Sequence, residues 1–346
     1  MKVILPMLLL IFCLAQPVEA LEIEAPAVPE SGQNLMPKRA ESFGEGLWQI
    51  IKASVGVMHP DIREASKLCL TAFGMLLLCS LIGSLAQGNG KVCNCVSAVA
   101  LGTLLLENTQ SLIQLGTRTV TEISEYGKLL LPVITTAMAA QGGVTASAAL
   151  YGGTALFLNI LSSLISRLLV PLVYLFLALA VAHGALGDEL LKKGRDFLKW
   201  LSVWSLKTIL YVFTGYMGIT GVVSGTTDAA ALKAAKLTIS GVVPVVGGIL
   251  SDASEAVLVG ARVVKNTAGI YGILAVIAVC IGPFIKIGIH YLMLKFTAVL
   301  AGVVGSKPMC GLVEDFSGVM GLVLGMTGSV CLLVLISTVC FLKGVG

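Results

Sequence analysis

The chain has 346 residues, of which 56% are hydrophobic and 12% are charged, and its mean hydropathy is +0.95. A soluble domain carries roughly 25% charged residues, so this composition excludes an ordinary water-soluble globular protein. The net charge of +4 is modest and argues against a nucleic-acid-binding surface, which needs clustered basic residues. Because no segment alternates with period two over many strands, the composition predicts an all-α, polytopic helical membrane protein.

The N-terminus has the pattern of a signal peptide. Lys2 precedes the apolar core "VILPMLLLIFCLA", and "VEA" (Val18–Ala20) ends in a small residue. The core is short for a membrane span, so we expect cleavage after Ala20; an uncleaved anchor is the alternative, since Glu19 fits the cleavage site poorly. The expected organisation is a signal peptide at 1–20, a flexible exported tail at 21–43 and a helical membrane domain at 44–346.

From residue 44 onward, apolar blocks alternate with short polar joints. The first stretch, Gly44–Leu68, is amphipathic and is predicted to lie along the membrane surface. Six to eight spans are expected in the blocks that follow, at about Leu68–Ala86, Val92–Leu115, Leu129–Leu150, Thr154–Ala182, Trp200–Val223, Thr267–Ile289, Leu292–Gly305 and Val319–Leu342. The second block contains polar residues that must face protein or water rather than lipid, namely Glu107, Asn108, Gln110 and Gln114.

The orientation of these spans stays open. After a cleaved signal peptide, four crossings would leave "KKGRDFLK" (Lys192–Lys199) outside, although Lys and Arg favour the cytoplasmic side. One of the first four blocks is therefore predicted not to cross. Either the Gly-rich segment Met138–Gly153 is a turn between half-spans, or the polar half of the second block stays at the surface.

Glycines recur along two predicted helices. The four in the last block fall in one arc of roughly 80°, at about 100° per residue. A stripe of glycines lets another helix approach closely, so it predicts helix packing, either with a partner subunit or copy or within the chain. The residues are Gly318, Gly321, Gly325 and Gly328 in the last block, and Gly215, Gly218, Gly221 and Gly225 in a broader, earlier stripe.

The segment before Thr267 combines broken apolar elements with charged helix ends. Thr227 or Asp228 can cap a short Ala-rich helix, and the spacing of Asp252 and Glu255 is that of a capping box for a second helix. This pattern predicts a re-entrant or interfacial helical hairpin that lines a cavity or docks on a partner, with a plain surface hairpin as the alternative. The candidate assembly or hairpin residues are Asp228, Lys233, Lys236, Pro244, Gly247, Gly248, Asp252, Glu255, Arg262 and Lys265.

Two positive charges lie inside apolar blocks. Arg167 and Lys286 are costly there unless they are paired, face water or snorkel to the headgroups. Lys286 also follows Pro283, where a kink would free backbone carbonyls. We therefore name both as candidate conduit-lining residues, with snorkelling as the alternative.

The sequence lacks a recognisable catalytic constellation. None of its three histidines, His59, His183 and His290, has a second ligand at helical spacing, and Cys93 and Cys95 do not have the spacing of a zinc or redox site. "GNGKV" lacks the residues of a phosphate-binding loop. We predict no enzyme activity and no catalytic, cofactor-binding or metal-binding residue, so energy must come from a partner or an ion gradient.

The stretch "GYMGITGVVSGTTDAAALKAAKLTISGVVPVVGGILSDASEAVLVGARVVKNTAGIYG" resembles the most characteristic region of the stage III sporulation protein AE family. The resemblance depends on Asp228, Lys233, Lys236 and the motifs "VPVVGG", "SDA" and "VKN". It implies a multi-pass protein of the mother-cell membrane around the forespore of an endospore-forming bacterium. The partners that it implies are other stage III A proteins, including the cytosolic ATPase AA and the ring proteins AG and AH, and indirectly stage II protein Q.

Two functions of different classes follow. The first, implied by the resemblance, is a membrane subunit of the channel or secretion-like complex that joins mother cell and forespore, working by helix packing and partner docking. The alternative is a self-sufficient secondary transporter with a broken-helix substrate site, which the lack of a clear internal repeat disfavours.

Overall fold

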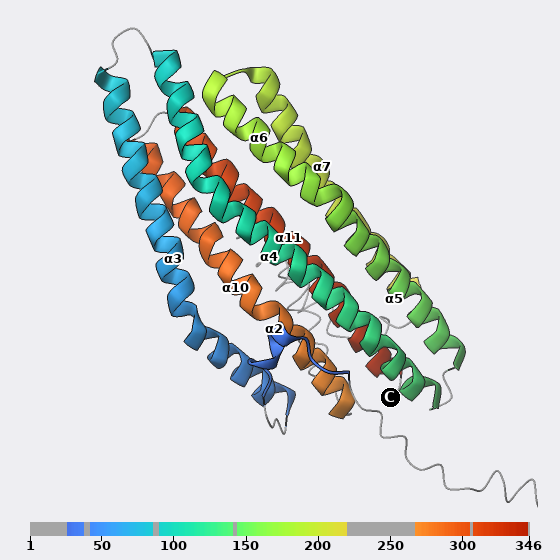
Figure 1. The fold of residues 1–346 in the computed structure, drawn as a ribbon. Helices are drawn as coiled ribbons and strands as arrows, with labels where there is room; N and C mark the ends of the chain where they lie inside the picture. The colour runs from blue at the N-terminus through green and yellow to red at the C-terminus, as the bar shows by residue number, and fades with distance from the viewer. Residues whose placement is uncertain are drawn as a thin grey trace, which may run out of the picture.

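The computed structural model describes residues 26–37, 42–85, 90–140, 144–219, 267–304 and 307–344, and these are helical apart from short connections. Their helices run lengthwise in an elongated bundle (Figure 1). The predicted all-α class is confirmed for this part of the chain. The predicted signal peptide at 1–20, the predicted hairpin at 238–266 and all ten candidate assembly or hairpin residues, from Asp228 to Lys265, lie outside the described residues.

The chain folds into a short helix and a set of long ones. The elements are α2 (Glu30–Gln33), α3 (Phe43–Leu85), α4 (Gly90–Ala140), α5 (Val144–Leu164), the π-helical turn η1 (Ile165–Leu169), α6 (Val170–Leu186), α7 (Glu189–Ile219), α10 (Thr267–Val304) and α11 (Lys307–Gly344). α3 and α10 lie on one side of the bundle and α5, α6 and α7 on the other, with α4 and α11 between them (Figure 1).

Helix α11 forms the centre of the bundle. It contacts α10, α4, α5, α6 and α7, and nearly all of its apolar segment is buried. Thr327, Ser329 and Ser337 each donate to the carbonyl oxygen four residues earlier in α11, whereas Ser317 donates to the Tyr291 carbonyl of α10. A helix whose polar groups are satisfied internally can be surrounded by apolar side chains at little cost.

Several predicted joints are continuous helix. The amphipathic stretch 44–68 and the first predicted span form the single helix α3, which contains Pro60 and whose N-terminal part bends away from the rest (Figure 1). The second block and the first part of the third, up to Ala140, lie in the single helix α4. The joint predicted between Ile289 and Leu292 lies inside α10. Polar residues need not end a helix: in α4, Arg118 pairs with Glu122 one turn later at 2.7 Å.

α4 ends at Ala140 and α5 begins at Val144, both within the Gly-rich segment Met138–Gly153, for which a turn was one of the two alternatives; residues 141–143 lie outside the described residues. The turn between α6 and α7 has a clear local cause. Gly187 takes the left-handed conformation at φ 69°, and its N–H donates to the His183 carbonyl at 2.8 Å. Asp188 then accepts a hydrogen bond from the Leu190 N–H and caps α7.

By length and composition alone, five helical segments of the described residues could cross a membrane: Phe43–Leu85, Val92–Thr136, Leu150–Leu186, Ile270–Val303 and Lys307–Phe341. α7 is not among them, although the span predicted at 200–223 covers its second half and runs past its last residue. The expected six to eight spans stay a prediction for the whole chain, because residues 220–266 lie outside the description.

Candidate functional site

An ion-paired cluster joins α10 to α3 near the middle of both helices. The Lys286 Nζ lies 2.9 Å from Glu64 Oε2 and 3.3 Å from Asp61 Oδ1. The Lys286 side chain is 30% exposed, and the two acids lie one turn apart on α3. Lys286, predicted as a conduit-lining residue, is thus held between two helices by carboxylates.

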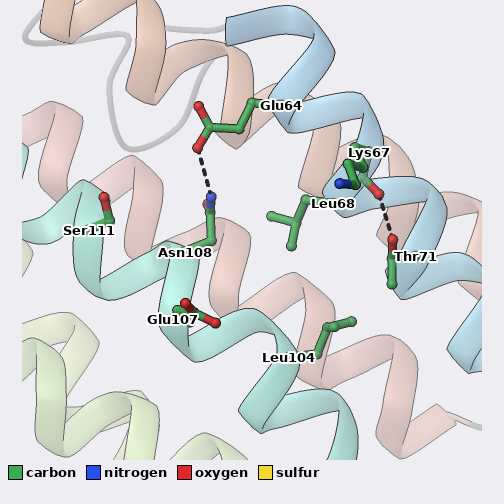
Figure 2. Close-up of a pocket in the computed structure, with 8 residues that line it drawn as sticks. All are labelled: Glu64, Lys67, Leu68, Thr71, Leu104, Glu107, Asn108 and Ser111. Atoms are coloured by element: carbon green, nitrogen blue, oxygen red, sulfur yellow. Dashed lines mark hydrogen bonds between the residues drawn. The ribbon is translucent and has the colours of Figure 1, made fainter.

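A polar cavity of about 410 Å³ lies beside this cluster, between α3 and α4 (Figure 2). Asn108 of α4 donates from Nδ2 to Glu64 Oε1 across 3.4 Å, while its own Oδ1 is buried without a hydrogen-bond partner. Glu107 and Lys67 also line the cavity. Of the two alternatives expected for Asn108, protein or water, its amide nitrogen meets protein, since it donates to Glu64 of α3. The cavity can hold a small polar molecule or several waters.

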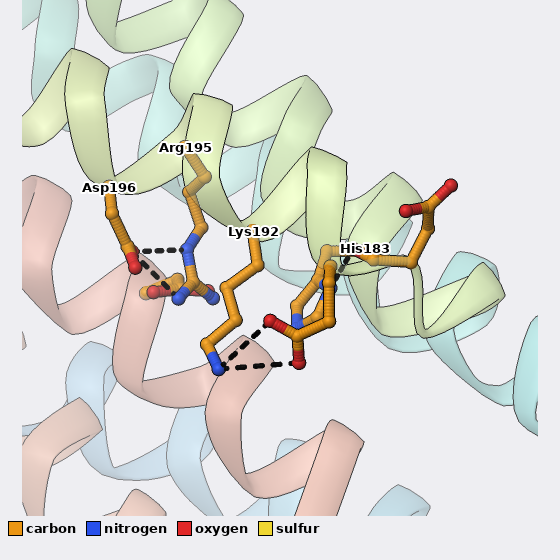
Figure 3. A network of polar contacts seen from close by, with 7 residues as sticks. His183, Lys192, Arg195 and Asp196 are labelled. Atoms are coloured by element: carbon orange, nitrogen blue, oxygen red, sulfur yellow. Dashed lines mark hydrogen bonds and ion pairs between the residues drawn. The ribbon is translucent and has the colours of Figure 1, made fainter.

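A second charged cluster joins α7 to α11 (Figure 3). The Arg195 Nη1 lies 2.6 Å from Asp315 Oδ2, and these side chains are only 13% and 11% exposed. Arg195 also donates to Asp196 at 2.8 and 3.0 Å. Burial lowers the pKa of Arg195, but the charges of Asp315 and Asp196 raise it more, so its pKa lies above the ordinary value.

One residue before Asp315, Glu314 pairs with Lys295 of α10 at 2.6 Å, and both side chains are about half exposed. A Cβ on Gly318, one turn further along α11, would lie 3.4 Å from the Lys199 Nζ of α7. Charged groups of α7, α10 and α11 are therefore gathered around the first turns of α11. We call Arg195, Lys199, Lys295, Glu314 and Asp315 the α11 charge cluster.

The other predicted site residues are dispersed. Arg167 is exposed in η1, whose main neighbours are α5 and α6, so it lies on a different helix group from Lys286. Gly321, Gly325 and Gly328 are buried along α11. Gly215 is exposed in α7 with nothing near the position of a Cβ, and Gly218 also lies in α7. Gly221 and Gly225 lie outside the described residues.

Sequence reasoning missed the partners of the paired charges. Asp315 and Arg195 are 120 residues apart, and Glu64 and Lys286 are 222 residues apart. The signal that could have found them is the cost of an unpaired charge among apolar residues, which demands a counter-charge somewhere. Among the described residues, no group of three or more His, Cys, Asp or Glu side chains is arranged to hold a metal ion.

Comparisons with known proteins agree with the sequence resemblance. The family model for stage III sporulation protein AE matches residues 35–344. A curated relative, "Stage III sporulation protein AE" of Bacillus subtilis (strain 168), is 24% identical over 275 residues, covering 78% of this chain and 68% of the relative. No solved structure matches the chain. Because the family match covers nearly all of the helical bundle, this chain belongs to the stage III sporulation protein AE family and is a sporulation protein with membrane helices.

Proposed function

We propose that the chain is a non-enzymatic integral membrane subunit of the channel or secretion-like complex between mother cell and forespore. It resides in the mother-cell membrane around the forespore. It works by packing its helices and by docking other stage III A proteins, including the ATPase AA and the ring proteins AG and AH. The chain interacts with stage II protein Q only indirectly. Family membership and the five apolar helices support this proposal.

The observation that carries the docking role is the length of the bundle. Helices of 38 to 51 residues are about 57 to 76 Å long at 1.5 Å per residue, whereas the hydrocarbon core is about 30 Å thick. Exposed charges such as Arg63 and Glu107 near the middle of the helices cannot face lipid. Part of the bundle therefore projects from the hydrocarbon as a folded helical surface that other proteins can reach.

Co-purification from sporulating cells tests the proposal. The tagged chain, solubilised in mild detergent, should recover the ATPase AA and the ring proteins AG and AH. As a control, an unrelated multi-pass protein of the same membrane that carries the same tag should not recover these proteins. If the chain is recovered alone under conditions that preserve another known membrane complex, the subunit role is wrong.

A secondary transporter remains the second candidate because of the α3–α4 cavity, where an acid, a lysine and the unpartnered Asn108 oxygen meet. The two functions predict different behaviour of the isolated protein. A transporter would carry polar solutes across liposomes without partners, and Asn108→Ala would slow that uptake. A complex subunit would show no uptake alone.

A further inference from the structure

The two halves of α3 expose different chemistry. In residues 68–85 the helix carries no charged residue. Its large exposed side chains there are all apolar, namely Leu70, Leu78, Leu81, Ile82 and Leu85, and the exposed hydroxyls of Thr71 and Ser84 donate to backbone carbonyls of the same helix. In residues 43–67, by contrast, the exposed side chains include Glu45, Lys52, Arg63 and Lys67. The two halves of α3 cannot both be surrounded by lipid hydrocarbon, because exposed charges do not face lipid.

Helices α4 and α10 show the same division at the same end of the bundle. α4 begins where α3 ends, and its first turns expose Val92, Val96 and Val99, whereas Glu107, Arg118, Glu125 and Lys128 are exposed further along. α10 exposes Leu292, Phe296, Val299 and Val303 in its C-terminal half, whereas residues 273–280 are buried by protein. The end of α3, the start of α4 and the end of α10 lie toward the same end of the bundle (Figure 1).

We infer that the lipid hydrocarbon contacts this end of the bundle along α3, α4 and α10. The apolar collar comprises residues 68–85, 92–106 and 292–303. Its α3 segment of 18 residues is about 27 Å long, close to the thickness of the hydrocarbon core. The opposite half of α3, with its exposed charges, then lies outside the hydrocarbon. This inference depends on the membrane helices of the family and goes beyond the proposed complex, so either can fail without the other.

The collar is interrupted where α10 meets α11. Lys295 and Glu314 lie at this end of their helices, and their side chains are 48% and 58% exposed. An ion pair at membrane depth faces protein or water rather than lipid. The collar therefore contacts lipid through α3, α4 and the outer face of α10, while the side with the α11 charge cluster is turned toward another protein or an aqueous space.

Tryptophan quenching in vesicles tests the placement. The chain has three tryptophans, Trp48, Trp200 and Trp204, and each is more than half exposed, so replacing all three with Phe should leave the fold intact. In that background, Leu78→Trp probes the collar and Leu156→Trp probes an exposed apolar site of α5. A third protein, W200F/W204F, keeps Trp48 as the matched probe in the other half of α3. Each full-length protein is reconstituted into phosphatidylcholine–phosphatidylglycerol vesicles.

Lipids brominated on their acyl chains should quench the fluorescence of the Leu78→Trp probe at least about twofold more than that of Trp48. The reason is that the acyl chains fill the hydrocarbon core. Acrylamide in the water should quench Trp48 and the Leu156 probe more than the Leu78 probe. Acyl-chain quenching that is stronger at position 156 or 48 than at position 78 would overturn the placement. If Leu78→Trp or Leu156→Trp does not fold, Ile82→Trp and Ile160→Trp, which are also exposed, take their places.

Discussion

Lys286 of α10 and Glu64 of α3 lie 2.9 Å apart although 222 residues separate them in the chain. With Asp61 at 3.3 Å, this contact links the two helices on one side of the bundle. It also joins the polar cavity to the only charged residue in the apolar stretch 267–294 of α10. The contact lies close to the level where α3 changes from charged to apolar.

Removing the Lys286 charge should loosen α3. Lys286→Met keeps the length of the side chain but leaves two acids without their cation, so we expect a lower melting temperature in detergent. The loss of free energy of unfolding should be modest, about 1 kcal/mol, since Glu64 is about half exposed. Lys207→Met, at an exposed lysine of α7, is the control and should melt like the wild type. If Lys286→Met and Lys207→Met have the same melting temperature, the Lys286–Glu64 pair does not contribute to stability.

The buried pair Arg195–Asp315 should matter more. Asp315→Ala leaves the Arg195 guanidinium without its nearest buried counter-charge, and breaking a buried pair costs roughly 3–5 kcal/mol. The double variant R195M/D315L removes both charges and should recover most of this loss. Thermal unfolding in detergent measures both. If the double variant is no more stable than Asp315→Ala, the cost does not come from the uncompensated charge.

Close packing of α4 on α11 gives a steric test. A Cβ at Gly116 would collide with the Val323 side chain, and Thr327 lies nearby as well. Gly116→Ala should therefore lower the free energy of unfolding by about 1–3 kcal/mol. Gly152→Ala, in α5 with open space around it, is the matched control and should be neutral or slightly stabilising. Similar unfolding of the two variants would contradict the close approach of α4 and α11.

The exposed pair Lys295–Glu314 tests whether the charged side of the bundle docks a partner. The swap K295E/E314K preserves the pair within the chain but reverses the charges that a partner meets. We expect normal melting and membrane insertion, but reduced recovery of other stage III A proteins from sporulating cells. Glu125→Lys, at an exposed acid of α4, controls for a general effect of charge reversal. If K295E/E314K recovers the other stage III A proteins as well as the wild type does, this face is not a docking surface.

The hairpin residues give a prediction that stands on the sequence alone. Replacing Asp228 or Glu255 with Ala removes a predicted helix cap. We expect impaired complex assembly and fewer mature spores, with the protein still inserted in the membrane. Glu125→Ala, which removes an exposed carboxylate of α4, is the control. Normal spore numbers and an intact complex in both hairpin variants would contradict an assembly role.

The sequence was a good guide to class and a poor guide to helix ends. It predicted helices at the right places because apolar residues such as Leu101 and Leu105 recur at helical spacing and are buried. It divided α4 at its polar middle, around Arg118, because polar residues in an apolar block resemble a joint. Only the bundle shows that Asn108 and neighbouring polar groups meet α3, so that the helix continues through them.

By itself, the sequence determined that the chain is apolar and predicted that it is helical, since composition and local periodicity are properties of neighbouring residues. Its motifs in residues 215–272 carried the resemblance to the sporulation family. The tertiary structure alone decided which charges meet. Arg195 pairs with Asp315, and Lys286 pairs with Glu64, only when helices far apart in the chain pack side by side. The physical reason is that an ion pair depends on a distance of a few ångströms in space, which spacing along the chain does not encode.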